Sequence, residues 1–191
     1  MDNRLRIIGG KWRGRKLDFP DVEGLRPTPD RIRETLFNWL QKYIQGARCL
    51  DLFSGSGALG IEALSRGAGY TLLIDNNKEV VSQLRNHLET LQVTEGEIRQ
   101  GDALQILTSS PDGPPFDIVF LDPPFGKGQI TPCVKSLESN GWLTENARVY
   151  IEAESSLQDL NLPDNWDILR QQKAGQVTCF LAARHPSMPE S

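Results

Sequence analysis

The sequence predicts an α/β protein with a doubly wound, mainly parallel β-sheet. Three observations predict this fold: strand-like and helix-like segments alternate from Ala47 onward, a glycine-rich turn follows the first of these strands, and Phe116–Asp122 forms an apolar run. Such alternation places helices on both faces of a parallel sheet, whose inner strands are buried and apolar. A length of 191 residues suits one domain with a short extension.

The first predicted unit, residues 1–46, is a basic arm followed by an amphipathic helix. Arg4–Leu17 alternates in polarity and contains three glycines, which predicts a short β-hairpin or an extended arm. Thr28 is expected to cap the following helix, with Pro29 in its first position. The apolar face of that helix is predicted to carry Ile32, Leu36, Leu40 and Tyr43.

The second predicted unit is the main domain, residues 47–185, in which the elements follow one another closely. Its parallel strands are predicted at Cys49–Phe53, Tyr70–Asp75, Glu97–Asp102, Phe116–Asp122 and Arg148–Glu154. Helices are predicted at Ala58–Arg66, Asn77–Leu91, a short segment ending at Leu107, and Ile130–Ser139. Two late strands, Trp166–Arg170 and Gln176–Ala183, could form an antiparallel hairpin, and residues 186–191 are predicted to be a disordered tail.

Charge is distributed unevenly along the chain, although the formal net charge is −4. Basic residues outnumber acidic ones up to Arg48, so the remainder is strongly acidic. Charge alone equally fits a contact with a polyanion and a flexible, solvated tail.

Composition excludes several other classes of protein. The three cysteines have no CxxC spacing and lie in apolar or helical segments, so buried thiols are expected. His87 and His185 lie far apart without metal-ligand spacing, so no metal site is expected. No apolar run is long enough for a membrane helix or a signal peptide, which predicts a cytoplasmic protein without a membrane partner.

The turn after the first main-domain strand predicts a nucleotide-like ligand. Gly55, Gly57 and Gly60 fit the GxGxxG pattern, whose glycines let a ligand approach the backbone at a helix N-terminus. Asp75 ends the next strand and could accept both ribose hydroxyls. S-adenosylmethionine fits better than a dinucleotide: Asp51 could bind its ammonium, and Asp102 or the backbone there could bond adenine.

The tetrapeptide Asp122-Pro123-Pro124-Phe125 follows the apolar fourth strand and resembles motif IV of amino-methyltransferases. An exocyclic amine is a poor nucleophile because its lone pair is delocalised into the ring. The Asp122 carboxylate and the Pro123 carbonyl are two acceptors for its N–H groups, and two prolines hold them rigidly. Phe125 could stack on a flipped base. The motif leaves guanine N2, adenine N6, cytosine N4 and a glutamine amide open.

The flanking segments narrow this choice through a resemblance. The stretches RIIGGKWRGRKL, LRPTPDRIRETLFNWL, LDLFSGSGALGIEALSRGA, DPPF and KAGQV together resemble the ribosomal small-subunit methyltransferase D family. The resemblance runs from about Arg4 to Ala183. It implies a class I, Rossmann-like methyltransferase fold with a seven-stranded sheet and an S-adenosylmethionine cofactor. It also implies methylation of a guanine N2 in 16S ribosomal RNA of the small ribosomal subunit.

The same resemblance implies the site residues. The cofactor contacts would be Asp51, Phe53, Ser54, Gly55, Ser56, Gly57, Asp75, Asn76, Asp102 and Ala103; the catalytic set would be Asp122, Pro123, Pro124 and Phe125. Thr28, Arg31 and Arg33 would lie near the mouth of the site. With the basic arm, the expected RNA-binding set is Arg4, Arg6, Lys11, Trp12, Arg13, Arg15, Lys16, Arg31 and Arg33. A monomer is expected.

Several alternatives remain at this stage. A DNA adenine-N6 methyltransferase shares the DPPF motif, but the chain has little room for a target-recognition domain after Glu154. A protein glutamine methyltransferase shares it as well. A non-catalytic RNA-binding assembly factor would not need Asp51, Asp75 and Asp122, and a nicotinamide oxidoreductase would leave DPPF unexplained.

Overall fold

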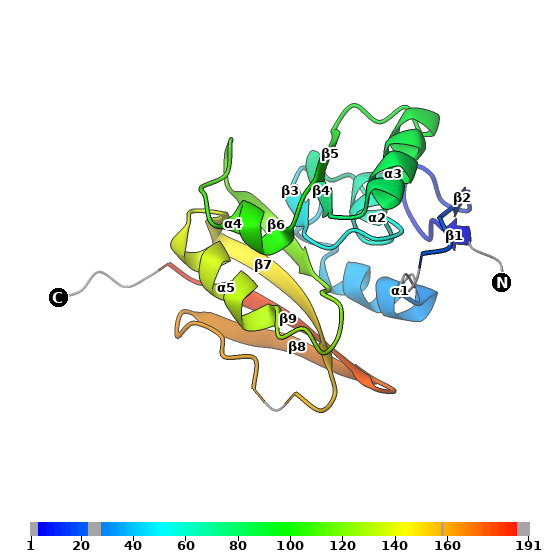
Figure 1. The fold of residues 1–191 in the computed structure, drawn as a ribbon. Coiled ribbons are helices and arrows are strands. Elements are labelled where there is room, and N and C mark those ends of the chain that lie inside the picture. Colours follow the sequence, from blue (N-terminus) through cyan, green and yellow to red (C-terminus); the bar gives the residue numbers. More distant parts are fainter. Residues whose placement is uncertain (1–3, 23–27, 158, 187–191) are drawn as a thin grey trace.

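The computed structural model describes residues 4–22, 28–157 and 159–186 (Figure 1). A seven-stranded sheet has the order β5-β4-β3-β6-β7-β9-β8, and β1 and β2 form a separate two-stranded sheet. The strands are β1 (Arg4–Arg6), β2 (Lys16–Asp18), β3 (Arg48–Asp51), β4 (Tyr70–Asp75), β5 (Gly96–Gln100), β6 (Phe116–Leu121), β7 (Leu143–Glu154), β8 (Trp166–Ala174) and β9 (Val177–Arg184). The helices are α1 (Asp30–Trp39), α2 (Gly60–Ser65), α3 (Lys78–Thr90), α4 (Ala103–Leu107) and α5 (Ile130–Ser139).

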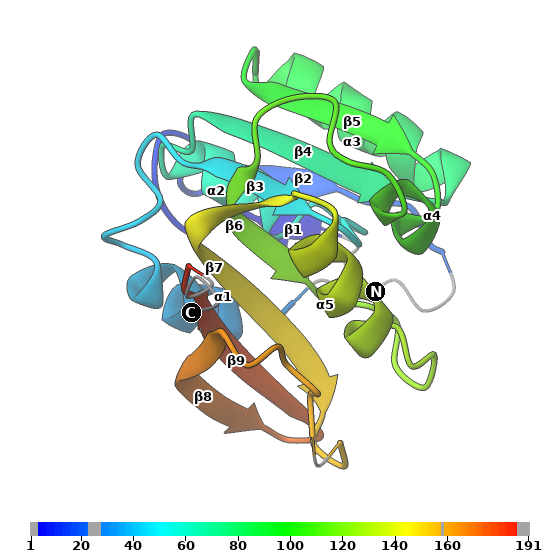
Figure 2. The ribbon, with the colours of Figure 1, turned by 90° about the vertical axis from the view of Figure 1, so that its left-hand side faces the viewer.

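The large sheet is parallel from β5 to β7 and antiparallel where β9 joins β7 and β8. Its order reverses at β3, which pairs with β4 on one side and β6 on the other. Helices cover both faces of the sheet (Figure 2). The predicted doubly wound fold, its seven strands and its C-terminal hairpin are therefore confirmed.

The two faces of the sheet have separate cores. Leu36, Phe37 and Leu40 of the α1 region pack on Phe120 and Tyr150 of the sheet. On the opposite face α4 and α5 pack through another buried cluster, which contains Leu107, Val134, Leu137 and Trp142. Each apolar helix stripe is thus buried against one side of the sheet, as its 3.6-residue period requires.

The N-terminal hairpin packs on the main domain. Its inward side chains, Leu5, Ile7, Trp12 and Leu17, form one core cluster with residues of α2, β4 and α3. Backbone bonds reinforce this contact, since Lys11 N donates to Ser65 O at 2.7 Å and Trp12 N donates to Ser65 Oγ at 3.0 Å. The arm is therefore held in place by apolar packing, with its charged side chains on the outer surface.

The start of α1 differs from the prediction. Pro29, not Thr28, is the N-cap residue, and no side chain caps this helix. The hydroxyl of Thr28 instead contacts the carboxyls of Asp122 and Glu152. Tyr43 was expected on the apolar face, but α1 ends at Trp39 and Tyr43 is 41% exposed.

Other expectations can be compared with the described part of the chain. All three cysteines are buried, as predicted. In the described ranges, no helix has the length and apolar character needed to cross a bilayer. Of the predicted disordered tail, residues 187–191 lie outside the described residues.

Candidate active site

Four acidic side chains follow or end neighbouring strands at one edge of the sheet. Asp51 ends β3, Asp75 ends β4, Asp122 follows β6, and Glu152 lies near the end of β7. This edge contains the carboxyl ends of the parallel strands, beside the reversal of strand order at β3. Ligands bind at such a position in open α/β sheets.

The glycine-rich turn between β3 and α2 is tied to the neighbouring strand β4. Ser54 N donates to Ile74 O at 2.9 Å, and Gly55 N donates to Asp75 Oδ2 at 2.9 Å. Gly55 and Gly57 have φ angles of 49° and 80°, which side chains disfavour. The turn therefore needs glycine at both positions.

Asp51 is a buried carboxyl under this turn. Its Oδ2 accepts the N–H of Gly60 at 2.9 Å, and a Cβ at Gly60 would lie 3.0 Å from that oxygen. Burial, together with the nearby Asp75 carboxylate, raises the pKa of Asp51 to about 7. None of the ion pairs among described residues involves Asp51. A ligand cation at this point would stabilise the ionised form, so the residue suits an ammonium group.

Asp75 has a structural role as well as a possible ligand role. Its two oxygens accept N–H groups from Gly55 and Asn77, each at 2.9 Å. Each carboxylate oxygen has two lone pairs, so acceptor capacity remains for ribose hydroxyls. Asn76 is exposed beside it.

The remaining predicted cofactor residues are spread around the same edge. Asp102 is exposed, and its side chain caps α4 by accepting the N–H of Gln105 at 2.9 Å. Ala103 is buried. Phe53 is half-buried, whereas Ser54 and Ser56 are buried in the turn. A bond to adenine at Asp102 stays a prediction.

The tetrapeptide after β6 borders a cavity of about 320 Å³. Its lining includes Pro123, Pro124 and Phe125 of the tetrapeptide and Glu154 and Leu157 from the end of β7 and the segment after it. Phe125 is 47% exposed, which leaves its ring available for stacking. Glu154 accepts the N–H of Gly126 and so connects this loop to the end of β7.

Glu152 is a site residue that the sequence analysis missed. It is only 5% exposed, and its Oε1 accepts the Tyr150 hydroxyl at 2.8 Å. Burial raises the pKa of Glu152, and burial together with the Glu152 charge raises that of Asp122 well above its usual range. A glutamate inside the apolar segment Val149–Ala153 was the available signal.

Two of the predicted RNA-binding residues are buried in the fold. The guanidinium of Arg33, 1% exposed, donates to Arg6 O and to Asp30 Oδ1 and forms an ion pair with Glu62. Trp12 is 8% exposed and belongs to the hairpin core. Neither side chain is available to RNA, so these two predictions are wrong: both residues satisfy internal contacts.

The other basic candidates lie at the surface. Arg6 forms an ion pair with Asp30 at 2.9 Å. The remaining exposed residues are Arg4, Lys11, Arg13, Arg15, Lys16 and Arg31. Their contact with RNA stays a prediction.

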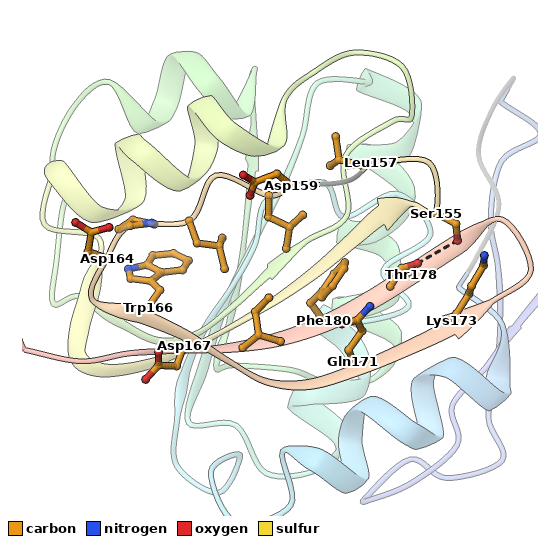
Figure 3. A pocket seen from close by; sticks show the side chains of 14 residues that line it. Ser155, Leu157, Asp159, Asp164, Trp166, Asp167, Gln171, Lys173, Thr178 and Phe180 are labelled. Carbon is orange, nitrogen blue, oxygen red and sulfur yellow. Dashed lines mark hydrogen bonds between the residues drawn. The ribbon is translucent and has the colours of Figure 1, made fainter.

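A larger cavity, of about 760 Å³, shares the lining residue Leu157 with the first one (Figure 3). It is an open groove between the segment that follows β7 and the β8–β9 hairpin, and Trp166, Phe180 and Lys173 are among its lining residues. None of the predicted site residues lines it. Size alone therefore does not locate the chemistry, which follows the acidic strand ends.

Comparison with known proteins shows the family of the chain. The family model described as Conserved hypothetical protein 95 matches residues 5–183. Ribosomal RNA small subunit methyltransferase D of Escherichia coli (strain K12) is 48% identical over 181 residues, which cover 95% of this chain and 90% of that protein. The protein of the same name from Haemophilus influenzae is 44% identical over 176 residues, 91% of each chain.

Two solved structures have the same fold over almost the whole chain. The structure of yhhF from Escherichia coli has a TM-score of 0.90 and 44% identity, and the match covers 96% of this chain and 99% of that one. A Haemophilus influenzae structure has a TM-score of 0.83 and 40% identity, covering 95% and 99% of the two chains.

Proposed function

This chain belongs to the Conserved hypothetical protein 95 family, and from that premise we propose that it is an S-adenosylmethionine-dependent methyltransferase of 16S ribosomal RNA. The proposed acceptor is the N2 amino group of a guanine in the small ribosomal subunit. The observation that carries the proposal is the DPPF tetrapeptide at the end of β6, within a chain that matches Ribosomal RNA small subunit methyltransferase D along most of its length.

The residues at the strand ends fit the proposed methyl donor. S-adenosylmethionine would supply an electrophilic methyl group on a sulfonium. Asp51 offers a buried carboxyl for the ammonium, and Asp75 offers acceptors for the ribose hydroxyls. The turn Ser54–Gly57 brings backbone close to the ligand, because glycine occupies both positions with positive φ.

Asp122 and the Pro123 carbonyl are proposed to accept the two N–H groups of the guanine N2. Accepting both bonds localises the nitrogen lone pair and directs it at the methyl group. Phe125 would stack on the flipped base, since its ring is exposed beside the cavity. Most of the rate enhancement would come from positioning and from electrostatics at the amine.

The proposed RNA contact is the outer surface of the N-terminal hairpin. Lys11, Arg13, Arg15 and Lys16 lie there, and phosphate contacts of this kind position a nucleic acid without reading its sequence. We further propose that the enzyme acts as a monomer in the cytoplasm.

The test uses purified protein, tritiated S-adenosylmethionine and small subunits that lack the modification. We expect label in the RNA and, after digestion to nucleosides, in N2-methylguanosine. Label in N6-methyladenosine or in a glutamine of a ribosomal protein would contradict the proposed acceptor, as would label in DNA in a parallel reaction with DNA as the substrate. Absence of transfer to any of these would contradict the enzyme function and favour an assembly factor.

A variant links the activity to the tetrapeptide. Asp122→Ala should lower the single-turnover rate by about 100-fold or more, because a positioned acceptor acts on the reacting group. Binding of S-adenosylmethionine, measured by calorimetry, should change little. A rate near that of the wild type would remove Asp122 from the reaction.

A further inference from the structure

Asp122 and Glu152 lie side by side at the ends of adjacent strands. The parallel register pairs Leu121 of β6 with Ile151 of β7, so the next residue of each strand is the acid. Phe120 and Tyr150, two residues earlier, both belong to the core beneath α1. Because side chains alternate along a strand, both acids are directed to that same face.

Hydroxyl groups are the close polar partners of this pair. Tyr150 donates to Glu152 Oε1 at 2.8 Å, and the Thr28 hydroxyl contacts both carboxyls. A threonine hydroxyl has a single proton, so it donates to one carboxylate at a time. The other carboxyl then lacks that donor.

Burial opposes ionisation of both groups, and neighbouring negative charge further opposes that of Asp122. Asp51 on β3 adds a negative charge near Asp122, and Cys179 on β9 lies beside Tyr150 and Glu152. In the ranges that the structure describes, the ion pairs include neither Asp122 nor Glu152. Two neighbouring carboxyls resist carrying two negative charges, because each disfavours ionisation of the other.

We propose that Glu152 is a positioning residue whose carboxylate lies beside an ionised Asp122, that Asp122 receives the proton released by the methylated amine, and that the two acids then share this proton. The proposal rests on the proposed function and adds a residue to its site. Glu152 does not touch the substrate in this scheme. Its negative charge makes Asp122 more basic than a solitary aspartate would be.

The proton balance of the step is simple. As the amine nitrogen attacks, its lone pair forms the N–C bond and the sulfonium S–C bond breaks, with that electron pair staying on sulfur. The nitrogen then carries a positive charge and loses one proton, and the electron pair of that N–H bond returns to nitrogen. Asp122 takes this proton, and the pair then shares it and carries one negative charge in place of two, which relieves the repulsion between the two carboxylates.

The first experiment observes the pair without substrate. Carboxyl carbons of aspartate and glutamate are labelled with carbon-13 and titrated by NMR in the wild type, Glu152→Gln and Asp122→Asn. We expect two coupled steps in the wild type and, in each variant, one step at lower pH for the remaining acid. An Asp122 titration that is the same with and without Glu152 would overturn the proposal.

The second experiment measures single-turnover methylation of small subunits against pH. In Glu152→Gln, the acid limb of the profile should move to lower pH, and the maximal rate should fall by up to about tenfold for each pH unit by which Asp122 loses basicity. KM for small subunits should not change. Glu145→Gln, an exposed acid on the same strand, is the matched control.

Substitution of Thr28 should shift the acid limb in the direction opposite to that in Glu152→Gln. Two opposite shifts distinguish the proposed effect from a general loss of folding. Its hydroxyl lowers the pKa of both carboxyls, so Thr28→Val should move the acid limb to higher pH, whereas Thr28→Ser should restore it. Lower rates with unmoved limbs in Glu152→Gln and Thr28→Val would mean a structural role only and would overturn the proposal. Failure of the proposed function is distinct: the wild type would not methylate small subunits, yet its NMR titration would still report the pair.

Discussion

The guanidinium of Arg33 lies 3.4 Å from the carboxylate of Glu62, and both side chains are buried beneath the N-terminal hairpin. Glu62 also accepts the N–H groups of Ile8 and Gly9, at 2.9 and 2.7 Å, and the Nε–H of Arg66 at 2.8 Å. One carboxylate on α2 therefore holds the hairpin, and through Arg33 it also holds α1. The surface proposed to bind RNA depends on this buried link.

Glu62→Ala should destabilise the protein by about 3–5 kcal/mol, because it removes one of the two carboxylates paired with the buried Arg33 and leaves the N–H groups of Ile8 and Gly9 without their acceptor. Urea unfolding at neutral pH measures the loss. Glu89→Ala, an exposed acid on α3, should change the free energy of unfolding by no more than about 0.5 kcal/mol. Similar stabilities of the two variants would show that Arg33 does not need Glu62.

Asp75→Ala should weaken S-adenosylmethionine binding by about 1–3 kcal/mol, the usual effect of losing a charged hydrogen-bond partner. Calorimetry measures the affinity. Since Asp75 also accepts the N–H groups of Gly55 and Asn77, a melting curve must accompany it. Asp75→Asn retains one acceptor oxygen, so its affinity for S-adenosylmethionine should lie between those of the wild type and Asp75→Ala. Unchanged affinity in a folded Asp75→Ala protein would remove the residue from the cofactor site.

Asp51 should make stability depend on pH. Its folded pKa of about 7 lies above its usual value, so the folded state binds this proton more tightly than the unfolded state. The resulting stabilisation is complete below about pH 4 and is lost as pH rises to about 7, by at most about 1.4 kcal/mol per pH unit. Asp51→Asn has no such proton, so its stability relative to the wild type should be higher at pH 8 than at pH 5.

The same substitution tests the ammonium contact. The ionised form of Asp51 should bind the cation, so wild-type affinity for S-adenosylmethionine should rise as pH increases through about 7. Asp51→Asn should bind more weakly and lose this rise. Urea unfolding at pH 5 and pH 8 measures the change in stability, and calorimetry between these pH values measures the affinity for S-adenosylmethionine. Parallel pH dependence in the two proteins would place the titrating group elsewhere.

The repeating pattern of the main domain could be predicted because each strand and helix carries its own local signal. The predicted bounds of Tyr70–Asp75 and Ile130–Ser139 agree with β4 and α5. The strand predicted from Arg148 begins earlier, at Leu143, because Leu143 pairs with Phe116 of β6, and the register is irregular between this pair and the pair of Ile118 with Arg148. That irregularity depends on a neighbouring strand and has no local sequence signal.

The errors in the site share one physical cause, since charge and aromatic character do not reveal burial. Arg33 and Trp12 resemble RNA contacts in the sequence, but tertiary partners bury both. Conversely, Glu152 is distant in sequence from Asp122, and only the register of β7 on β6 brings them together. Acids at strand ends were predictable because parallel strands share one edge.

The basic residues on the outer surface of the hairpin should provide much of the affinity for RNA. Replacing Arg13, Arg15 and Lys16 with alanine should raise KM for small subunits, because these exposed cations suit phosphate contacts and the rest of the chain is acidic. The dependence of binding on salt should flatten by about two to three units of slope, at about 0.7–0.9 per lost phosphate contact. S-adenosylmethionine affinity and melting temperature should barely change, since the apolar side of the hairpin remains packed.

The control for this variant removes equal charge from a distant surface. Lys135 on α5 and Arg170 and Lys173 on β8 are exposed, and β8 lies at the edge of the sheet away from the hairpin (Figure 1). Replacing these three with alanine should leave the salt slope nearly unchanged. A slope equal to that of the wild type in a stable Arg13, Arg15 and Lys16 variant would show that the hairpin is not the RNA contact. A joint loss of melting temperature and of all activities would instead show that these side chains support the fold.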